Sequence, residues 1–166
     1  MMSPAQIRFA VDRMLGRLAR MLRLLGYDTV YANNVTTAQL LALGRSGERV
    51  VLTRGETAKR FPHLKNVLSL KSEYPPEQLR EVVERFGLDI RAGLWTRCTL
   101  CNAPVERVEK AAVEARVDAK ILRLYEEFYR CTGCNHIYWR GSHVDRILRN
   151  LAVVLGVEKS RSQEVE

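Results

Sequence analysis

The chain has 166 residues, of which 46% are hydrophobic, so it suits one compact domain or a domain with a small appendage. No apolar run reaches the roughly 18 residues that cross a bilayer, and the first residues lack the features of a signal peptide, so we expect a cytoplasmic protein without a membrane anchor. The formal charge of +8 favours a polyanion such as nucleic acid as the partner, although a basic surface can also serve solubility alone.

Short apolar segments alternate with helical segments along the first half of the chain. The predicted strands are residues 7–11, 29–32, 49–53 and 66–70. The predicted helices are residues 13–26, 37–43, 56–61 and 75–87, and glycines close the first and last of them. This alternation predicts a parallel sheet covered by helices, which is an α/β fold.

The pattern changes near residue 90, shortly before the cysteines begin. We therefore expect an α/β domain over residues 1–90 and a small cysteine-containing domain over residues 91–156. The second domain is expected to end in a closing helix over residues 142–156. The polar tail, residues 157–166, is expected to be disordered.

The four cysteines form two CxxC pairs that are separated by 29 residues. Each pair can place two thiolates on one side of a tight turn, and two such turns complete a tetrahedron around a zinc ion. The gap is longer than the usual template, so the insert must carry strands or a helix of its own. A site with four sulfur ligands leaves no position open for chemistry and is therefore structural. The predicted zinc ligands are Cys98, Cys101, Cys131 and Cys134.

Other roles for the cysteines fit the sequence less well. Two disulfides would require an oxidising compartment, and nothing in the chain indicates export. A redox-active CxxC would sit beside a strand–helix–strand unit, whereas both pairs follow the predicted α/β region. Zinc is therefore the preferred interpretation.

The first predicted helix carries a row of basic side chains. At 100° per residue, these side chains fall within an arc of about 120°, and leucines and methionines occupy the other side. The row consists of Arg13, Arg17, Arg20 and Arg23. A guanidinium group binds phosphate through two hydrogen bonds at once. An ordinary solvated face is the alternative, but the row has no acidic partner at helical spacing, so phosphate contact is favoured.

Asp12 stands where the first predicted strand gives way to the helix. Ligands bind at the carboxyl ends of strands in parallel α/β sheets, so a carboxylate there could hold Mg²⁺ or Mn²⁺. Hydrolysis of a phosphodiester by such ions needs several carboxylates. The alternative is that Asp12 caps the helix, because aspartate is favoured at that position.

Four sequence motifs together resemble a known family. They are VDRMLGRLARMLRLLGYDTVYA, RVVLTRG, RCTLCN and CTGCNHIYWRGSH, and the likeness extends from about residue 7 to residue 151. They resemble the Mut-seven-type C-terminal RNase domain family, which combines a PIN-like nuclease fold with a zinc ribbon. The resemblance implies a PIN-like parallel sheet with flanking helices, followed by a small C-terminal zinc ribbon. It also implies a metal-dependent ribonuclease with acidic residues at its strand ends.

The acidic residues of the family are only partly present here. Asp12 occupies the first acidic position, whereas Thr37 (or its neighbour Thr36) and Gly55 stand where the family usually has acids. Glu56 and Asp28 are the remaining candidates that could join Asp12 in a catalytic site.

Three hypotheses follow from the sequence. The chain is an active ribonuclease that uses Mg²⁺ or Mn²⁺, or it is an RNA-binding module that has lost catalysis, or it is an interaction protein whose zinc ribbon docks a protein partner. The number of carboxylates within reach of one metal ion beside Asp12 separates the first two hypotheses.

Overall fold

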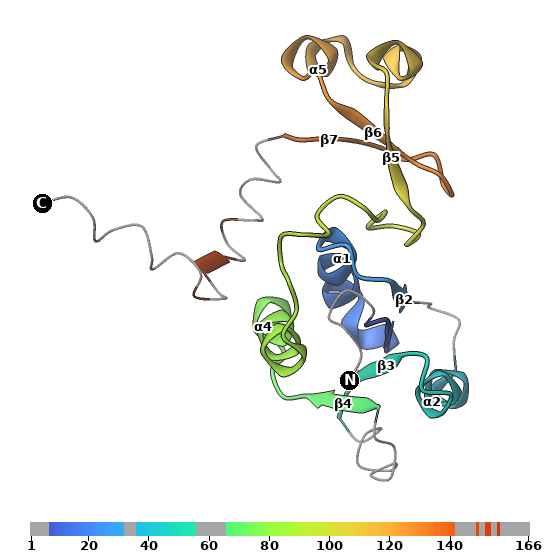
Figure 1. Cartoon of the computed structure of the whole chain (residues 1–166), viewed down its shortest axis with the longest axis vertical. Helices are drawn as coiled ribbons and strands as arrows, with labels where there is room; N and C mark the ends of the chain where they lie inside the picture. Colours follow the sequence, from blue (N-terminus) through green and yellow to red (C-terminus); the bar gives the residue numbers. More distant parts are fainter. Residues whose placement is uncertain are drawn as a thin grey trace, which may run out of the picture. The chain divides into compact units, whose positions relative to one another are not determined.

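The computed structural model describes residues 7–31, 36–55 and 66–141, together with isolated positions at 149, 152, 153 and 156. The chain forms two compact units, Met1–Pro104 and Val105–Glu166 (Figure 1). The predicted helix at 56–61 and the tail at 157–166 lie outside the described residues, as does most of the predicted closing helix at 142–156. Among the described helices, none is both long and apolar enough to span a membrane.

The first unit is built on a four-stranded parallel sheet, as the sequence predicted. Its strands are β1 (Phe9–Val11), β2 (Thr29–Tyr31), β3 (Val50–Arg54) and β4 (Val67–Leu70), and their order is β2-β1-β3-β4. Val11 at the end of β1 lies beside Tyr31 of β2 and Leu52 of β3. The carboxyl ends of these strands therefore meet at one edge of the sheet.

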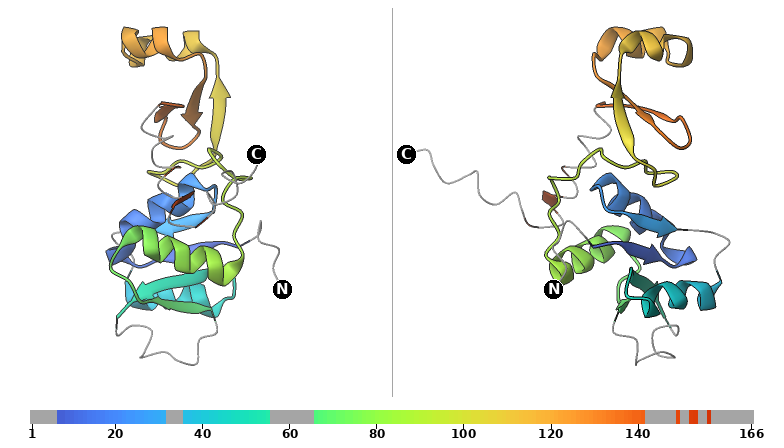
Figure 2. Two further views of the ribbon diagram at one scale, coloured as in Figure 1. Left: turned by 90° about the vertical axis from the view of Figure 1, so that its left-hand side faces the viewer. Right: turned by 45° about the vertical axis from the view of Figure 1, so that its right-hand side comes forward.

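Helices cover both faces of this sheet (Figures 1 and 2). They are α1 (Gly16–Leu24), which follows the short 3-10 turn η2 (Arg13–Leu15), α2 (Thr37–Arg45) and α4 (Pro75–Phe86). Alternate side chains of a strand point to opposite faces. Phe9 makes an edge-to-face contact with Phe86 of α4, whereas its neighbour Ala10 packs with Leu40 of α2. The α/β fold is thus a three-layer arrangement, which explains why all of β1 is buried.

A close backbone contact guides the chain away from the α/β core. Gly26, which follows α1, has a φ of +90°, and a Cβ atom there would lie only 2.0 Å from the carbonyl oxygen of Gly93. Only glycine tolerates both this backbone conformation and this approach. The segment that follows α4 is therefore held against the end of α1, directly before the first cysteine pair.

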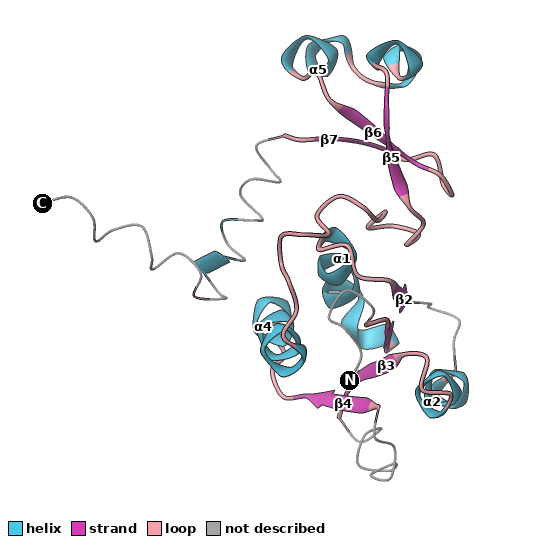
Figure 3. Ribbon diagram, viewed as in Figure 1, coloured by secondary structure: helices cyan, strands magenta, loops and turns pink. Residues whose placement is uncertain are grey.

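The second unit contains a three-stranded antiparallel sheet (Figure 3). Its strands are β5 (Val105–Val108), β6 (Phe128–Cys131) and β7 (Ile137–Trp139), in the order β5-β6-β7. Between β5 and β6 the chain forms the 3-10 turns η3 (Lys110–Ala112) and η4 (Glu114–Arg116) and the helix α5 (Ala119–Leu124). Val113, Phe128 and Ile137 form its small core. The insert between the cysteine pairs thus carries its own strands and helix, as its length predicted.

Candidate functional site

The two CxxC pairs fold into turns with the same backbone hydrogen bonds. In the first, the N–H of Cys98 donates to the Ala103 carbonyl (2.8 Å), and the N–H of Asn102 donates to the Cys98 carbonyl (3.0 Å). In the second, the equivalent bonds run from Cys131 to His136 (2.9 Å) and from Asn135 to Cys131 (3.1 Å). Identical CTxCN sequences therefore produce identical turns, which we name the first and second knuckles.

An asparagine in the left-handed region closes each knuckle. Asn102 has a φ of 72° and Asn135 a φ of 58°. Asparagine accepts this conformation more readily than most residues because its short polar side chain can hydrogen-bond locally. This explains why the residue after the second cysteine is asparagine in both motifs.

Backbone N–H groups point at the sulfur atoms of the first cysteine in each knuckle. The Cys101 N–H lies 3.4 Å from the Cys98 Sγ, and the N–H groups of Gly133 and Cys134 lie 3.3 Å and 3.4 Å from the Cys131 Sγ. Hydrogen bonds to a charged form favour that form, so these donors stabilise thiolates.

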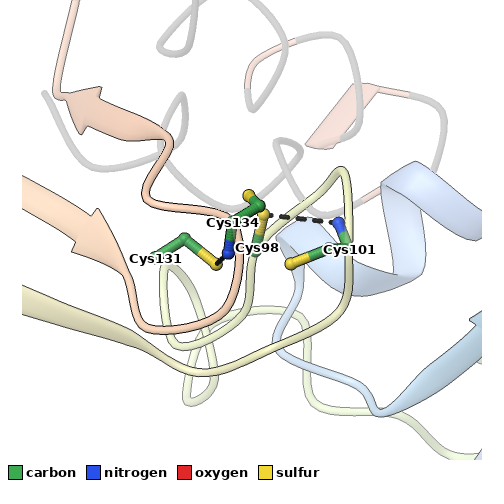
Figure 4. Close-up of side chains that lie close together, drawn as sticks. All are labelled: Cys98, Cys101, Cys131 and Cys134. Carbon is green, nitrogen blue, oxygen red and sulfur yellow. Dashed lines mark hydrogen bonds between the residues drawn. The ribbon is translucent and has the colours of Figure 1, made fainter.

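The four sulfur atoms gather in one cluster that could hold a metal ion (Figure 4). All four Sγ atoms lie within 4.8 Å of one another, with Cys98 and Cys131 buried and Cys101 and Cys134 exposed. Ligands at the usual zinc–sulfur distance of about 2.3 Å would stand about 3.8 Å apart in a tetrahedron. The predicted ligand set is therefore brought together, and its chemistry and spacing fit zinc.

Asp28 lies at the opposite edge of the sheet from Asp12. It directly precedes β2, whereas Asp12 directly follows β1, and the two strands run parallel. Its carboxylate accepts two hydrogen bonds from Arg49 (2.9 and 3.0 Å) and one from Asn102 (2.8 Å), and Arg97 lies 3.9 Å away. The structure does not bring Asp28 to the predicted catalytic site, because this ion-pair network holds it elsewhere.

The network sets the protonation of Asp28. Burial alone would raise the pKa of its carboxyl group, but the hydrogen bonds from Arg49 and Asn102 and the charges of Arg49 and Arg97 outweigh burial. The pKa of Asp28 therefore lies below its ordinary value, and the group is ionised at neutral pH.

Arg23 is separated from the rest of the basic row by burial. It is only 4% exposed, and its Nε donates to the Thr29 carbonyl (2.9 Å). Its Nη1 donates to the carbonyls of Leu100 (2.7 Å) and Thr99 (3.1 Å) in the first knuckle. Burial lowers its pKa, and the negative charges of Cys98 and Cys101 oppose that shift. The prediction of an exposed row is thus wrong for Arg23, because the first knuckle covers the last turn of α1.

Asp12 lies at the carboxyl edge of the sheet, and the structure gives its carboxylate a hydrogen bond from one side chain. Its Oδ2 accepts a hydrogen bond of 2.8 Å from the hydroxyl of Thr53, a fully buried residue of β3. Its side chain makes no capping hydrogen bond to the turn that follows, so the alternative role as a helix cap is not realised. Within residues 7–31, 36–55 and 66–141, the only group of three or more candidate metal ligands is the cysteine cluster. Glu56 lies outside the described residues.

A cavity of about 550 Å³ opens at this same edge. Four arginines line it, three of them exposed members of the predicted row and the fourth the last residue of β3: Arg13, Arg17, Arg20 and Arg54. Glu73, three residues beyond β4, also lines the cavity and forms an ion pair with Arg54. The cavity therefore carries a surplus of positive charge, and Arg13, the residue that follows Asp12, is part of its wall.

Sequence reasoning missed Arg54 and Glu73 as residues of this site. Both follow or end a strand at its carboxyl end, which is the position where ligand-binding residues of parallel sheets occur. The sequence places both residues at or just after the end of a predicted strand. It does not show which strands are neighbours, so it could not show that the two residues share one site.

A four-stranded parallel sheet flanked by helices and followed by a four-cysteine cluster places the chain among the PIN-like α/β proteins. The profile of the family described as Mut7-C RNAse domain matches residues 7–151. The chain belongs to this family, which confirms the resemblance in the sequence motifs. No curated protein matches the chain.

Proposed function

We propose that this protein acts on RNA and holds the phosphates of the strand in the cavity at the carboxyl edge of the sheet. One observation carries the proposal: Arg13, Arg17, Arg20 and Arg54 come from three elements, η2, α1 and β3, and line the same cavity. A solvated charged face would not need to converge in this way. Cavities of this volume accept ligands, and guanidinium groups are suited to phosphate. The family supports RNA as the polymer.

Metal-dependent hydrolysis of the phosphodiester is a second candidate function. It is favoured by Asp12, whose carboxylate has Thr53 as its hydrogen-bond donor rather than an arginine. Mg²⁺ commonly binds through one or two carboxylates, with water and substrate phosphate as the other ligands. Asp12 would be one of these carboxylates, and Glu56 remains the candidate from the sequence for a second. When bound, Mg²⁺ or Mn²⁺ would polarise the phosphate and lower the pKa of a water molecule. Asp12 would hold the ion, and the arginines would orient the strand.

We assign a structural zinc ion to the cysteine cluster, and with it the cytoplasm as the compartment, because a thiolate site needs reducing conditions. Four sulfur ligands satisfy a tetrahedral ion completely, so the cluster has no role in hydrolysis. Arg23 places a positive charge beside the first knuckle, which carries Cys98 and Cys101.

The test compares RNA binding and cleavage in matched variants. The double substitution Arg17→Ala and Arg20→Ala removes two charges from the cavity, whereas Arg8→Ala removes an exposed charge that precedes β1 at the other edge. By fluorescence anisotropy with a single-stranded RNA, we expect the double variant to bind at least about tenfold more weakly. The slope of log affinity against log salt should fall by about 0.7 for each lost phosphate contact. Arg8→Ala should bind like the wild type.

Cleavage is measured on the same RNA with Mg²⁺ or Mn²⁺. If Asp12 holds the ion, Asp12→Asn should lose at least about a hundredfold in rate while it still binds RNA, because removing a metal ligand removes the stabilisation of transition-state charge. Cleavage that survives this substitution would exclude Asp12 from the mechanism. RNA affinity that is unchanged in the double arginine variant would contradict the proposal as a whole.

A further inference from the structure

We infer that zinc in the cysteine cluster tightens RNA binding at the cavity, because the first knuckle anchors α1 and β2, two elements that supply part of the cavity wall. The inference rests on the proposed function and adds a regulator to it. Arg23 and Asn102 make the connection between the knuckle and these elements. Both are positioning residues, since neither lines the cavity.

The first connection runs through α1. In the last turn of this helix, the Nη1 of Arg23 donates to the carbonyls of Leu100 (2.7 Å) and Thr99 (3.1 Å), which lie between the two cysteines of the first knuckle. Arg23 is buried, so losing these acceptors would leave a charged group without its partners. Arg17 and Arg20 belong to the same helix and line the cavity. The backbone of the knuckle therefore fixes the helix that carries two of the cavity's arginines.

The second connection runs through β2. The Oδ1 of Asn102 accepts a hydrogen bond of 3.0 Å from the N–H of Thr29, the first residue of this strand. Tyr31, the last residue of the strand, lines the cavity, and its hydroxyl donates to the Arg13 carbonyl (3.1 Å). The same ring packs closely on Gly16, where a Cβ atom would lie 2.7 Å from the hydroxyl oxygen. A displacement at the start of β2 would therefore reach the cavity wall within three residues.

Zinc governs both connections because it holds the first knuckle closed. The carbonyls that accept from Arg23 stand between two of the metal ligands, and Asn102 directly follows the second ligand. Four thiolates whose sulfur atoms lie within 4.8 Å of one another repel unless a cation balances them. Loss of zinc would therefore loosen the turn and withdraw the partners of α1 and β2. Coupling between two binding sites is reciprocal, so RNA that orders the wall should also tighten zinc binding.

The test measures both affinities on the full chain under reducing conditions, without added Mg²⁺ or Mn²⁺. Fluorescence anisotropy gives the affinity for a single-stranded RNA, first with zinc-loaded protein and then with protein stripped by a chelator. Competition with a chromophoric chelator gives the zinc affinity with and without saturating RNA. We expect zinc to tighten RNA binding about 5- to 150-fold and RNA to tighten zinc binding by the same factor, which we call the coupling factor.

The two knuckles supply a matched pair of variants. Asn102→Gly keeps the left-handed backbone but removes the side-chain hydrogen bonds to Thr29 and Asp28, so the coupling factor should fall about fivefold, the equivalent of one lost hydrogen bond. Asn135→Gly makes the same change in the second knuckle and should leave the coupling factor unchanged. Arg23→Lys keeps the positive charge but lacks the planar fork that bonds to Thr29 and the knuckle at once, so it should also lower the factor.

An equal coupling factor in the two asparagine variants would overturn the inference, because zinc would then act through the folding of the whole chain. RNA affinity that is indifferent to zinc in the wild type would overturn it too. The double variant Arg17→Ala and Arg20→Ala should bind RNA more weakly with and without zinc if the proposed function holds. Failure of the proposed function is therefore seen in that variant, and failure of the inference in the asparagine pair.

Discussion

The two edges of the parallel sheet each present an aspartate beside a strand, and the fold treats them in opposite ways. At the amino edge, Asp28 is bonded to Arg49 and Asn102 and has Arg97 nearby. At the carboxyl edge, Asp12 accepts a hydrogen bond from Thr53 and directly precedes Arg13, which lines the basic cavity. The positive charge of Arg49 thus balances the Asp28 carboxylate, whereas the Asp12 carboxylate bonds to a neutral hydroxyl and can still bind a cation. Both residues are aspartates, so their bonding partners, and not their residue type, indicate which one holds the structure together and which one can serve function.

The arginines of α1 show the same contrast between structural and functional side chains. Arg23 satisfies carbonyl groups inside the first unit, whereas Arg17 and Arg20 face the cavity. A buried guanidinium with several acceptors holds the structure together, and an exposed one beside a cavity can bind a phosphate.

The largest expected effect is the loss of folding stability when Asp28, rather than Asp12, is replaced by alanine. Asp28→Ala leaves Arg49, whose side chain is 13% exposed, without its carboxylate, so we expect a loss of about 3 kcal/mol in the free energy of unfolding. Asp12→Ala leaves the hydroxyl of the buried Thr53 without its acceptor and should cost about 1–2 kcal/mol. Urea unfolding at neutral pH and constant zinc concentration measures both values. Equal losses would show that both acids are structural.

A smaller effect should separate the two knuckles. Asn102→Ala loses the left-handed preference and two side-chain hydrogen bonds, to Asp28 and from the Thr29 N–H, so we expect a cost of about 2–3 kcal/mol. Asn135→Ala loses mainly the backbone preference and should cost about 1 kcal/mol. Asn102→Gly, which restores only the backbone freedom, should fall between them in thermal or urea unfolding. Identical costs for the two alanine variants would mean that the amino-edge network adds nothing.

The smallest effect is expected in the dependence of stability on pH. The pKa of Asp28 is lowered in the folded protein, so its contribution is complete above the unfolded value of about 4 and is lost as pH falls through the folded value. Asp28→Asn should be less stable at neutral pH but should lose less stability on acidification. Unfolding followed between pH 3 and pH 7 checks the slope. Parallel curves for the variant and the wild type would contradict the assignment.

The sequence predicted the architecture well because periodicity is a local property. The four parallel strands, the helices α1, α2 and α4, and the pairing of the cysteines all follow from spacing along the chain. The environments of Arg23 and Asp28 could not be predicted, because their partners, Leu100 and Asn102, lie more than 70 residues away. At 100° per residue Arg23 falls within the basic row, and only the folded chain shows that the first knuckle covers it. Arg54 and Glu73 were missed because strand order has no local signature.

The distribution of the cysteines implies an order of events on the ribosome. Cys98 and Cys101 belong to the first compact unit, which ends at Pro104, whereas Cys131 is added after a further 29 residues. At about 5–20 residues per second, that interval lasts roughly 1.5–6 s. During this time the nascent chain displays two thiols without their counterparts. The four-cysteine cluster can therefore form only after the insert has been translated, and a product that ends within the insert would retain the first cysteine pair alone.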